Sequence, residues 1–139
     1  MYYQLEPEVA GGWGPATVRD RVNPNHLLVF EYRFDGWLGD ELLTSHPYFI
    51  ITEQLSLLME PAKLSGYDLA EVIISKSEIF EDLYLFRILP AFVWLKVDGH
   101  AGRDDFGISS SKTLIVSGRA LSRLQLASLQ HCIINVYQE

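Results

Sequence analysis

Two stretches of this chain look alike and decide its predicted fold: PYFIITEQLSLLMEPAKLSGYDLAEVIIS at residues 47–75 and LIVSGRALSRLQLASLQHCIINVY at residues 114–137. In each, a short run rich in β-branched residues ends at a hydroxyl residue, Thr52 in the first and Ser117 in the second. A hydroxyl oxygen can accept a hydrogen bond from a free amide in the first turn of a helix, so both residues suit a helix cap. Each stretch therefore predicts a strand, a capped helix, a loop and a second strand.

The two predicted helices differ in length. Each carries a leucine pair at helical spacing, Leu55 with Leu58 and Leu121 with Leu124. Pro61 removes a backbone donor and clashes with the preceding turn, which limits the first helix to about residues 52–60. The second can run to about residue 128. Because the helices are offset by one residue between the copies, the sequence leaves open whether the two units arose by duplication.

Three further segments have the composition of strands: residues 2–5, 28–34 and 92–98. In the second segment Phe30, Tyr32 and Phe34 share one face and polar residues take the other, which is typical of a half-buried strand. The third segment is apolar on both faces, which indicates a covered position. Between these segments, Asp40 is expected to cap a short helical turn.

Together these elements predict an α+β fold in a single domain over residues 1–139. We expect a mostly antiparallel or mixed sheet of five to seven strands, with two or three helices, one of them a weak helical pattern at residues 78–84. The alternative is a doubly wound α/β fold. That fold would need a longer crossover helix than residues 52–60 provide.

Composition narrows the classes of function. The chain has 139 residues, of which 48% are hydrophobic and 21% charged, with a net charge of −7. These values predict a globular protein and disfavour direct nucleic-acid binding, which relies on basic residues to neutralise phosphates. No apolar run reaches the length of a membrane span and the first residues lack a signal-peptide pattern, so we expect a cytoplasmic protein without a membrane partner. The single cysteine, Cys132, lies in an apolar run and is expected to be a buried thiol.

The stretch GRDDFG at residues 102–107 contains the triplet Asp-Phe-Gly, which marks a magnesium ligand in protein kinases. The other kinase motifs are missing from the sequence, so the match is read as chance. Asp104 and Asp105 are expected in a turn, where they cap backbone amides, while Phe106 enters the core at the start of a strand. Asp98, His100, Asp104 and Asp105 could converge on a metal ion, but their spacing matches no EF-hand and favours a solvated loop.

Motifs of other enzymes are also missing. The sequence has no Gly-x-Ser-x-Gly elbow, no P-loop and no dinucleotide fingerprint. We therefore predict no catalytic residues, no cofactor and no metal.

What remains is a surface rich in acids and aromatics, a combination suited to binding another protein. The residues predicted to contact a partner are Asp35, Trp37, Asp40, Glu41, Asp98, His100, Asp104 and Asp105. A further acidic group, Glu78, Glu81 and Asp82, lies next to Tyr84. In the alternative interpretation, Trp37 and Phe106 belong to the core and the acids only cover the surface.

The first repeated stretch, followed by LPAFVWLKV, AGRDDFGIS and LIVSGRALSRLQLASLQHCII, resembles the immunity proteins of bacterial polymorphic toxin systems, specifically the α+β group related to the Myxococcus-type immunity domain. The resemblance covers about two thirds of the chain, and FDGWLGDELL adds a looser similarity before it. It implies a small cytosolic protein that binds a cognate toxin domain and blocks its active site or substrate path without catalysis. The family pattern offers no catalytic residues to carry over. The acidic character would suit a basic toxin such as a nuclease, because acidic side chains can stand in for substrate phosphates.

Two other classes stay open. One is an enzyme that uses a metal or an acid pair in the loop from Asp98 to Asp105. The other is a ligand-binding subunit of a homo-oligomer, which exposed faces of Phe92 and Trp94 would favour. The sequence does not distinguish a monomer from a homodimer.

Overall fold

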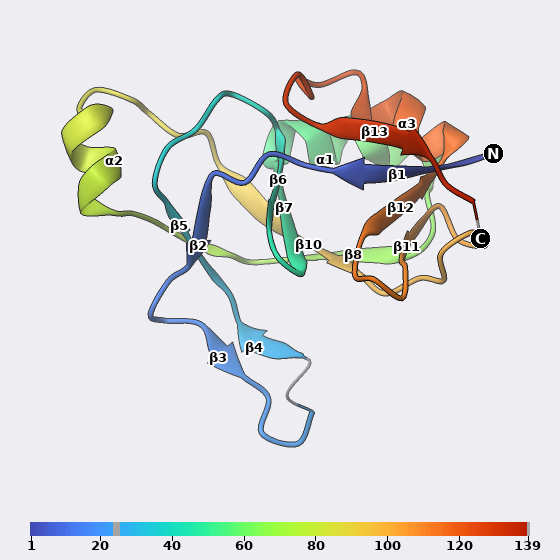
Figure 1. Ribbon diagram of the computed structural model, residues 1–139, viewed down its shortest axis with the longest axis horizontal. Coiled ribbons are helices and arrows are strands. Elements are labelled where there is room, and N and C mark those ends of the chain that lie inside the picture. Colours follow the sequence, from blue (N-terminus) through green and yellow to red (C-terminus); the bar gives the residue numbers. More distant parts are fainter. Residues whose placement is uncertain (24–25, 139) are drawn as a thin grey trace.

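Two four-stranded antiparallel sheets share one arrangement of strands (Figure 1). The computed structural model describes residues 1–23 and 26–138. One sheet has the order β6 (Leu42–Ser45), β7 (Tyr48–Thr52), β10 (Phe92–Val97), β8 (Tyr67–Ala70). The other has the order β11 (Phe106–Ile108), β12 (Leu114–Ser117), β1 (Tyr2–Glu6), β13 (Ile133–Val136).

In each sheet the second strand leads into a helix, α1 (Glu53–Met59) after β7 and α3 (Gly118–Leu124) after β12. Thr52 Oγ1 accepts a hydrogen bond from the amide of Leu55 at 3.1 Å. Ser117 Oγ accepts one from the amide of Ala120 at 3.1 Å. Both predicted caps are therefore confirmed.

The helices end differently from each other. α1 passes into the 3-10 turn η1 (Glu60–Ala62), which contains Pro61, so it ends close to the predicted position. α3 ends at Leu124, earlier than the predicted residue 128. The amide of Ser128 instead donates to the carboxylate of Glu41 at 3.1 Å, which draws the chain away from the helix axis.

The two predicted strand-helix-strand units have the same topology. After its helix, each chain segment returns as the outermost strand of its own sheet, β8 in one and β13 in the other. The strand between the pre-helix and post-helix strands is β10 in the first sheet and β1 in the second. The N-terminal strand thus completes the second unit in the way that β10 completes the first.

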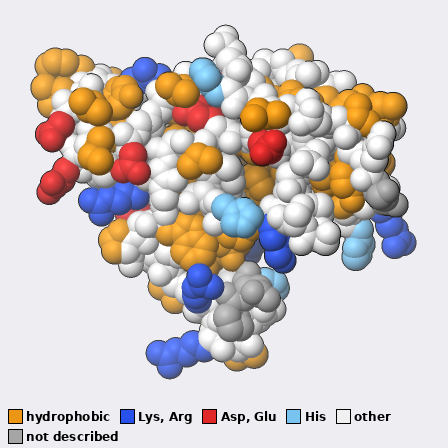
Figure 2. Space-filling model, in the orientation of Figure 1, with side chains coloured by type: hydrophobic (Ala, Val, Ile, Leu, Met, Phe, Trp, Pro, Cys, Tyr) orange, Lys and Arg blue, Asp and Glu red, His pale blue; other side chains and the backbone are white. Residues whose placement is uncertain are grey.

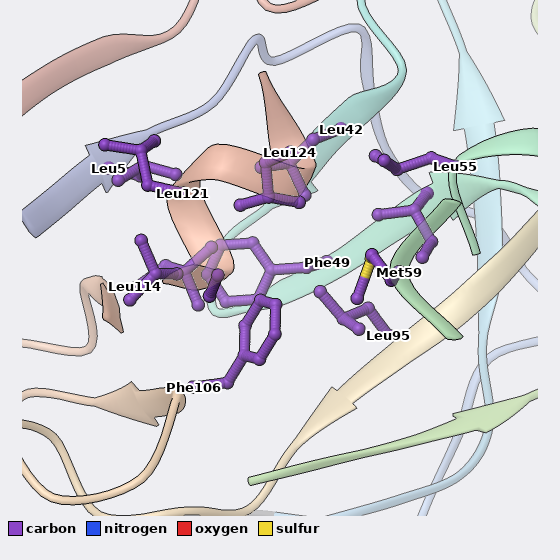
Figure 3. Close-up of a cluster of buried hydrophobic side chains, with 13 residues drawn as sticks. Leu5, Leu42, Phe49, Leu55, Met59, Leu95, Phe106, Leu114, Leu121 and Leu124 are labelled. Carbon is purple, nitrogen blue, oxygen red and sulfur yellow. The ribbon is translucent and has the colours of Figure 1, made fainter. Parts of the chain in front are cut away.

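α1 and α3 pack against each other over a shared core (Figure 3). Leu55 and Met59 of α1 meet Leu124 of α3, and all three are fully buried. Phe49 and Phe106 enter the same cluster from the two sheets. Each such side chain contributes about 1.5–3 kcal/mol on burial, so the core that joins the two units stabilises both of them.

A second core lies under a three-stranded sheet with the order β2 (Gly11–Trp13), β5 (Glu31–Phe34), β9 (Ile73–Lys76). Phe30, Tyr32 and Phe34 are buried on one face, as predicted. Glu31 on the opposite face is buried as well, because it accepts hydrogen bonds from the Ala16 amide and the Ser75 hydroxyl. β5 and β9 run parallel, unlike the strands of the two larger sheets.

Two elements project from this body (Figure 1). One is the hairpin of β3 (Val18–Arg19) and β4 (Leu27–Val29). The other is the short helix α2 (Glu78–Leu83), which matches the weak helical pattern predicted for this region. Within the described residues, no helix is long and apolar enough to cross a membrane.

The α+β class is confirmed, but the strands are more numerous than the five to seven predicted. The described residues form thirteen strands in several sheets. Many of them span only two to four residues, a length at which alternation of apolar and polar residues is hard to recognise. The prediction that Asp40 caps a helical turn is wrong: the residue is buried and no helix follows it.

Candidate protein-binding surface

The predicted partner-binding residues fall into two groups at different ends of the molecule, one in the loop from β5 to β6 and one in the loop from β10 to β11 (Figure 1). The first group is Asp35, Trp37, Asp40 and Glu41, and the second is Asp98, His100, Asp104 and Asp105. This separation in space depends on the tertiary fold and could not be predicted from the sequence. A partner would therefore have to contact the two groups at separate places.

Asp105 of the second group anchors other parts of the chain. Its Oδ1 accepts a hydrogen bond from the Ser117 hydroxyl at 2.6 Å, and its Oδ2 accepts one from the Ser65 amide at 2.9 Å. Arg119 pairs with the same carboxylate at 3.1 Å. Burial alone would raise the pKa of Asp105, but the hydrogen bonds from Arg119 and Ser117 outweigh it and hold the pKa below its ordinary value. The role of Asp105 in the structure is to tie a helix cap to a loop.

Glu41 of the first group has a similar role. Its Oε1 accepts a hydrogen bond from the Thr52 hydroxyl at 2.7 Å, and its Oε2 accepts one from the Ser128 amide at 3.1 Å. Both oxygens are therefore occupied within the protein, which leaves little of this carboxylate for a partner.

Asp40 is fully buried, so its prediction as a partner-contacting residue is corrected. Its Oδ2 accepts a hydrogen bond from the His131 amide at 2.8 Å, and its Oδ1 lies 3.1 Å from His131 Nδ1. Glu8 lies beside it, and its two oxygens accept hydrogen bonds from the amides of Leu38 and Asp40. These polar contacts join three distant segments of the chain.

Glu8, Asp40 and His131 could also offer three ligand atoms to a cation, since those atoms lie within 4.8 Å of one another. Every oxygen of the two carboxylates already accepts a hydrogen bond. Hydrogen bonds within the protein are therefore sufficient to explain why these side chains lie together. Among the described residues, this is the group whose possible ligand atoms lie close enough to share an ion. The side chains of the loop from Asp98 to Asp105, the alternative metal site considered from the sequence, do not converge in this way.

The remaining residues of the second group lie in a turn, as predicted. Asp104 Oδ2 accepts a hydrogen bond from the His100 amide at 2.7 Å, and both His100 and Asp98 are exposed. Although Asp98 is exposed as a residue, its carboxyl is partly shielded from water, and this desolvation together with the neighbouring charge of Asp68 raises its pKa. Phe106 is buried at the start of β11, which confirms its predicted place in the core.

Asp35 and Trp37 lie next to α2. Asp35 is exposed, while Trp37 is half-buried and donates from Nε1 to the carbonyl oxygen of Asp40 at 2.8 Å. The guanidinium of Arg87 lies over the indole ring of Trp37, 4.7 Å from its centroid. This contact connects the loop after β5 with the segment that follows α2.

α2 and the residues after it carry the largest run of exposed apolar side chains along the chain. We define the α2 surface as five residues: Ile79 (57% exposed), Leu83 (70%), Leu85 (69%), Phe86 (91%) and Ile88 (86%). Figure 2 shows hydrophobic side chains gathered at this end of the molecule, with acidic side chains beside them. A surface of this kind on a folded protein is typical of a site that binds another protein.

The local sequence explains why these side chains stay exposed. α2 has six residues, and Phe80 is its buried anchor, packed against Phe34 with ring centroids 6.3 Å apart. Tyr84 then covers Phe80, with ring centroids 5.1 Å apart, and closes the core. The apolar residues on either side of Phe80 have no core left to enter.

The acids of α2 are recognisable in the sequence as a candidate contact group, whereas the exposure of its apolar residues is not. The stretch EIFEDLYLFRIL has more apolar residues than one face of a short helix can bury, and that excess was the available indication. Exposure itself depends on the packing of distant strands, which the sequence does not display.

A hollow of about 590 Å³ lies between the β3 and β4 hairpin and the sheet that contains β7, β10 and β8, against Trp94. Lys96 lies over the indole of Trp94, with Nζ 4.8 Å from the ring centroid. Trp94 is 5% exposed and Phe92 is 7% exposed. The exposed aromatic faces that would have favoured a ligand-binding oligomer are therefore not found.

Comparison of the chain with protein-family models, with curated proteins and with solved structures finds no match.

Proposed function

We propose that this protein is a non-catalytic immunity protein that binds and neutralises a cognate bacterial toxin domain through the α2 surface. The observation that carries this proposal is the exposure of the apolar residues around α2, above all Phe86 and Ile88. Large aromatic and aliphatic side chains that protrude into solvent are the usual anchors of a protein interface. The resemblance to immunity proteins supports the class of partner.

The charges around the α2 surface support a basic partner. Glu78, Glu81 and Asp82 are exposed, and within residues 1–23 and 26–138 no hydrogen bond or ion pair engages their side chains. The whole chain carries a net charge of −7. Acids that surround an apolar anchor accelerate the approach of a positively charged protein and select against acidic ones. A nuclease-like toxin domain fits this description, and the proposed place of neutralisation is the cytoplasm.

Three of the residues predicted from the sequence to contact a partner are left out of the proposed interface. Asp40, Glu41 and Asp105 use their carboxylates to hold the fold together. Asp35 and Trp37 adjoin α2 through the contact between Trp37 and Arg87, so they extend the α2 surface. The proposed interface therefore consists of the α2 surface, its three acids and these two residues.

A growth assay tests the proposal. The C-terminal domain of the protein encoded immediately upstream is produced in a bacterial host with and without this chain. We expect the domain to arrest growth alone and growth to resume when this chain is co-produced. Replacement of Phe86 and Ile88 by aspartate should abolish rescue. The matched control is Leu57→Asp, because Leu57 is 67% exposed on the surface of α1.

Two results would overturn the proposal. One is an upstream gene product whose C-terminal domain is harmless, or whose toxicity this chain does not relieve. The other is a homodimer in sedimentation analysis that the Phe86→Asp variant converts to a monomer, because the α2 surface would then serve self-association.

A further inference from the structure

β9 has one side that no strand covers. It lies at the end of the sheet order β2-β5-β9, so among residues 1–23 and 26–138 its only strand partner is β5. The amide of Ile73 donates to the Phe30 carbonyl and the amide of Ser77 donates to the Phe34 carbonyl, both at 2.9 Å. Because backbone groups alternate in direction along a strand, the N–H and C=O groups of Ile74 and Lys76 point away from β5.

These outward groups face a groove rather than open solvent. The groove has a volume of about 730 Å³ and runs between β9 and the segment that leads into β10. Ile74 and Lys76 line one side, and Ile88, Pro90 and Phe92 line the other. The open edge therefore offers backbone hydrogen bonds along one wall and apolar contacts along the opposite wall.

An extended peptide is the ligand that satisfies both walls. A strand added to an open edge gains main-chain hydrogen bonds, while its alternate side chains enter neighbouring pockets. Ile88 belongs to both the groove and the α2 surface, so such a strand would lie beside the exposed apolar cluster.

The charges near the groove favour a basic strand. Glu81 lines it. Glu78 and Asp82 lie on the same short helix as Glu81. Two cations lie nearby and keep their charge: Lys76 Nζ donates to the Arg87 carbonyl at 3.3 Å, and the Arg87 guanidinium lies over the Trp37 ring. The three acids of α2 outnumber these two cations, so the net charge beside the groove is negative and attracts a basic segment.

We infer that β9 receives an extended basic segment of the toxin domain as an added strand, an inference that rests on the function proposed above. The segment pairs with the outward backbone groups of Ile74 and Lys76 and places apolar side chains against Ile88 and Pro90. The interaction is non-covalent and involves no chemical step.

Calorimetric titration of the full chain with the C-terminal domain of the upstream gene product tests this inference. Lys76→Pro removes an outward amide but leaves the inward bonds of Ser75 and Ser77 in place, which an edge strand tolerates. We expect it to weaken binding at least tenfold, whereas Lys76→Ala, which keeps the amide, should change the Kd by less than about threefold.

A proline on another open edge serves as the matched control. The amide of Tyr137 donates to the Tyr2 carbonyl, so the neighbouring amide of Val136 points outward from β13. Val136→Pro should therefore bind the toxin domain as the unmodified chain does.

Amide hydrogen exchange of the unmodified chain provides a measurement that needs no variant. The amides of Ile74 and Lys76 should exchange rapidly in the free protein and become protected in the complex. If the toxin domain binds but these amides stay unprotected, or if Lys76→Pro binds normally, strand addition is wrong and the proposed function stands. If the unmodified chain does not bind the domain at all, both the inference and the proposed function fail.

Discussion

Glu41 and Asp105 occupy equivalent positions in the two similar units. Each carboxylate accepts a hydrogen bond from the hydroxyl that caps its own helix, Thr52 at 2.7 Å for Glu41 and Ser117 at 2.6 Å for Asp105. The second oxygen of each accepts an amide from the loop that follows the other helix, Ser128 for Glu41 and Ser65 for Asp105. The backbone repeats the pattern, because the Thr52 amide donates to the Glu41 carbonyl and the Ser117 amide to the Asp105 carbonyl.

Glu41 and Asp105 therefore have the same structural role. An acid in each unit fixes the start of one helix and the exit from the other, so the helices are held as a pair. The match extends to main-chain contacts and to sheet order.

This equivalence predicts that loss of either helix cap lowers the free energy of unfolding by a similar amount. Thr52→Ala and Ser117→Ala should each lower the free energy of unfolding by about 1–3 kcal/mol, because each removes a helix cap and a partner of a carboxylate. Urea denaturation followed by circular dichroism measures the change. Ser122→Ala is the control, since this exposed hydroxyl on α3 only donates to the carbonyl of Gly118. A loss confined to one of the two cap variants would contradict the equivalence.

Replacement by alanine should lower stability strongly at Phe80 and hardly at all at Phe86. Phe80→Ala should cost about 3–5 kcal/mol of stability, because it empties the buried site that anchors α2. Phe86→Ala should change stability by less than about 0.5 kcal/mol, since the ring is 91% exposed. Thermal and urea denaturation of both variants checks the pair. Comparable losses would show that Phe86 supports the fold and is not reserved for a partner.

The ionised carboxylate of Asp98 should lower the free energy of unfolding at neutral pH. Its pKa is raised by burial and by the charge of Asp68, so ionisation is less favourable in the folded state than in the unfolded state. The cost is absent below the ordinary pKa of an aspartate and is fully present above the raised value. Asp98→Asn should therefore increase the free energy of unfolding at pH 7 and have little effect at pH 3. Asp35→Asn makes the same change of charge at another exposed position, far along the chain from Asp98 and Asp68, and an equal gain there would contradict a specific role for Asp98.

The thiol of Cys132 should be unreactive in the folded protein. Cys132 is half-buried and not fully buried as expected from the sequence. Its partial burial and the nearby charge of Asp40 raise its pKa to about 12, so little thiolate exists at pH 8. Labelling with a disulfide reagent should be slow in buffer and fast in denaturant. Labelling in buffer at the rate of a free cysteine would show that the thiol is open to solvent and ionised.

Local features of the fold could be predicted because they depend on neighbouring residues. The caps at Thr52 and Ser117, the end of α1 just before Pro61 and the entry of Phe106 into the core all follow from short-range geometry. The α+β class followed from the alternation of these local units with strands.

Long-range contacts could not be predicted in the same way. Asp40 binds His131 across 91 positions of sequence, and Glu41 binds Ser128 across 87. In the sequence, an acid that accepts a hydrogen bond from a distant amide cannot be told from an acid on the surface, so the sequence alone places both residues among the candidate partner contacts. The exposure of Phe86 is also set by distant packing, and only the excess of apolar residues around α2 indicated it.

Calorimetric titration with the C-terminal domain of the upstream gene product, at low and at high salt, tests the central claim most directly. We predict that the unmodified chain binds, that binding weakens as salt rises, and that Phe86→Ala raises the Kd about 10- to 100-fold while Leu57→Ala leaves it unchanged. Equal affinity of the Phe86→Ala and Leu57→Ala variants, or no binding by the unmodified chain, would contradict the claim that the α2 surface is the toxin-binding site.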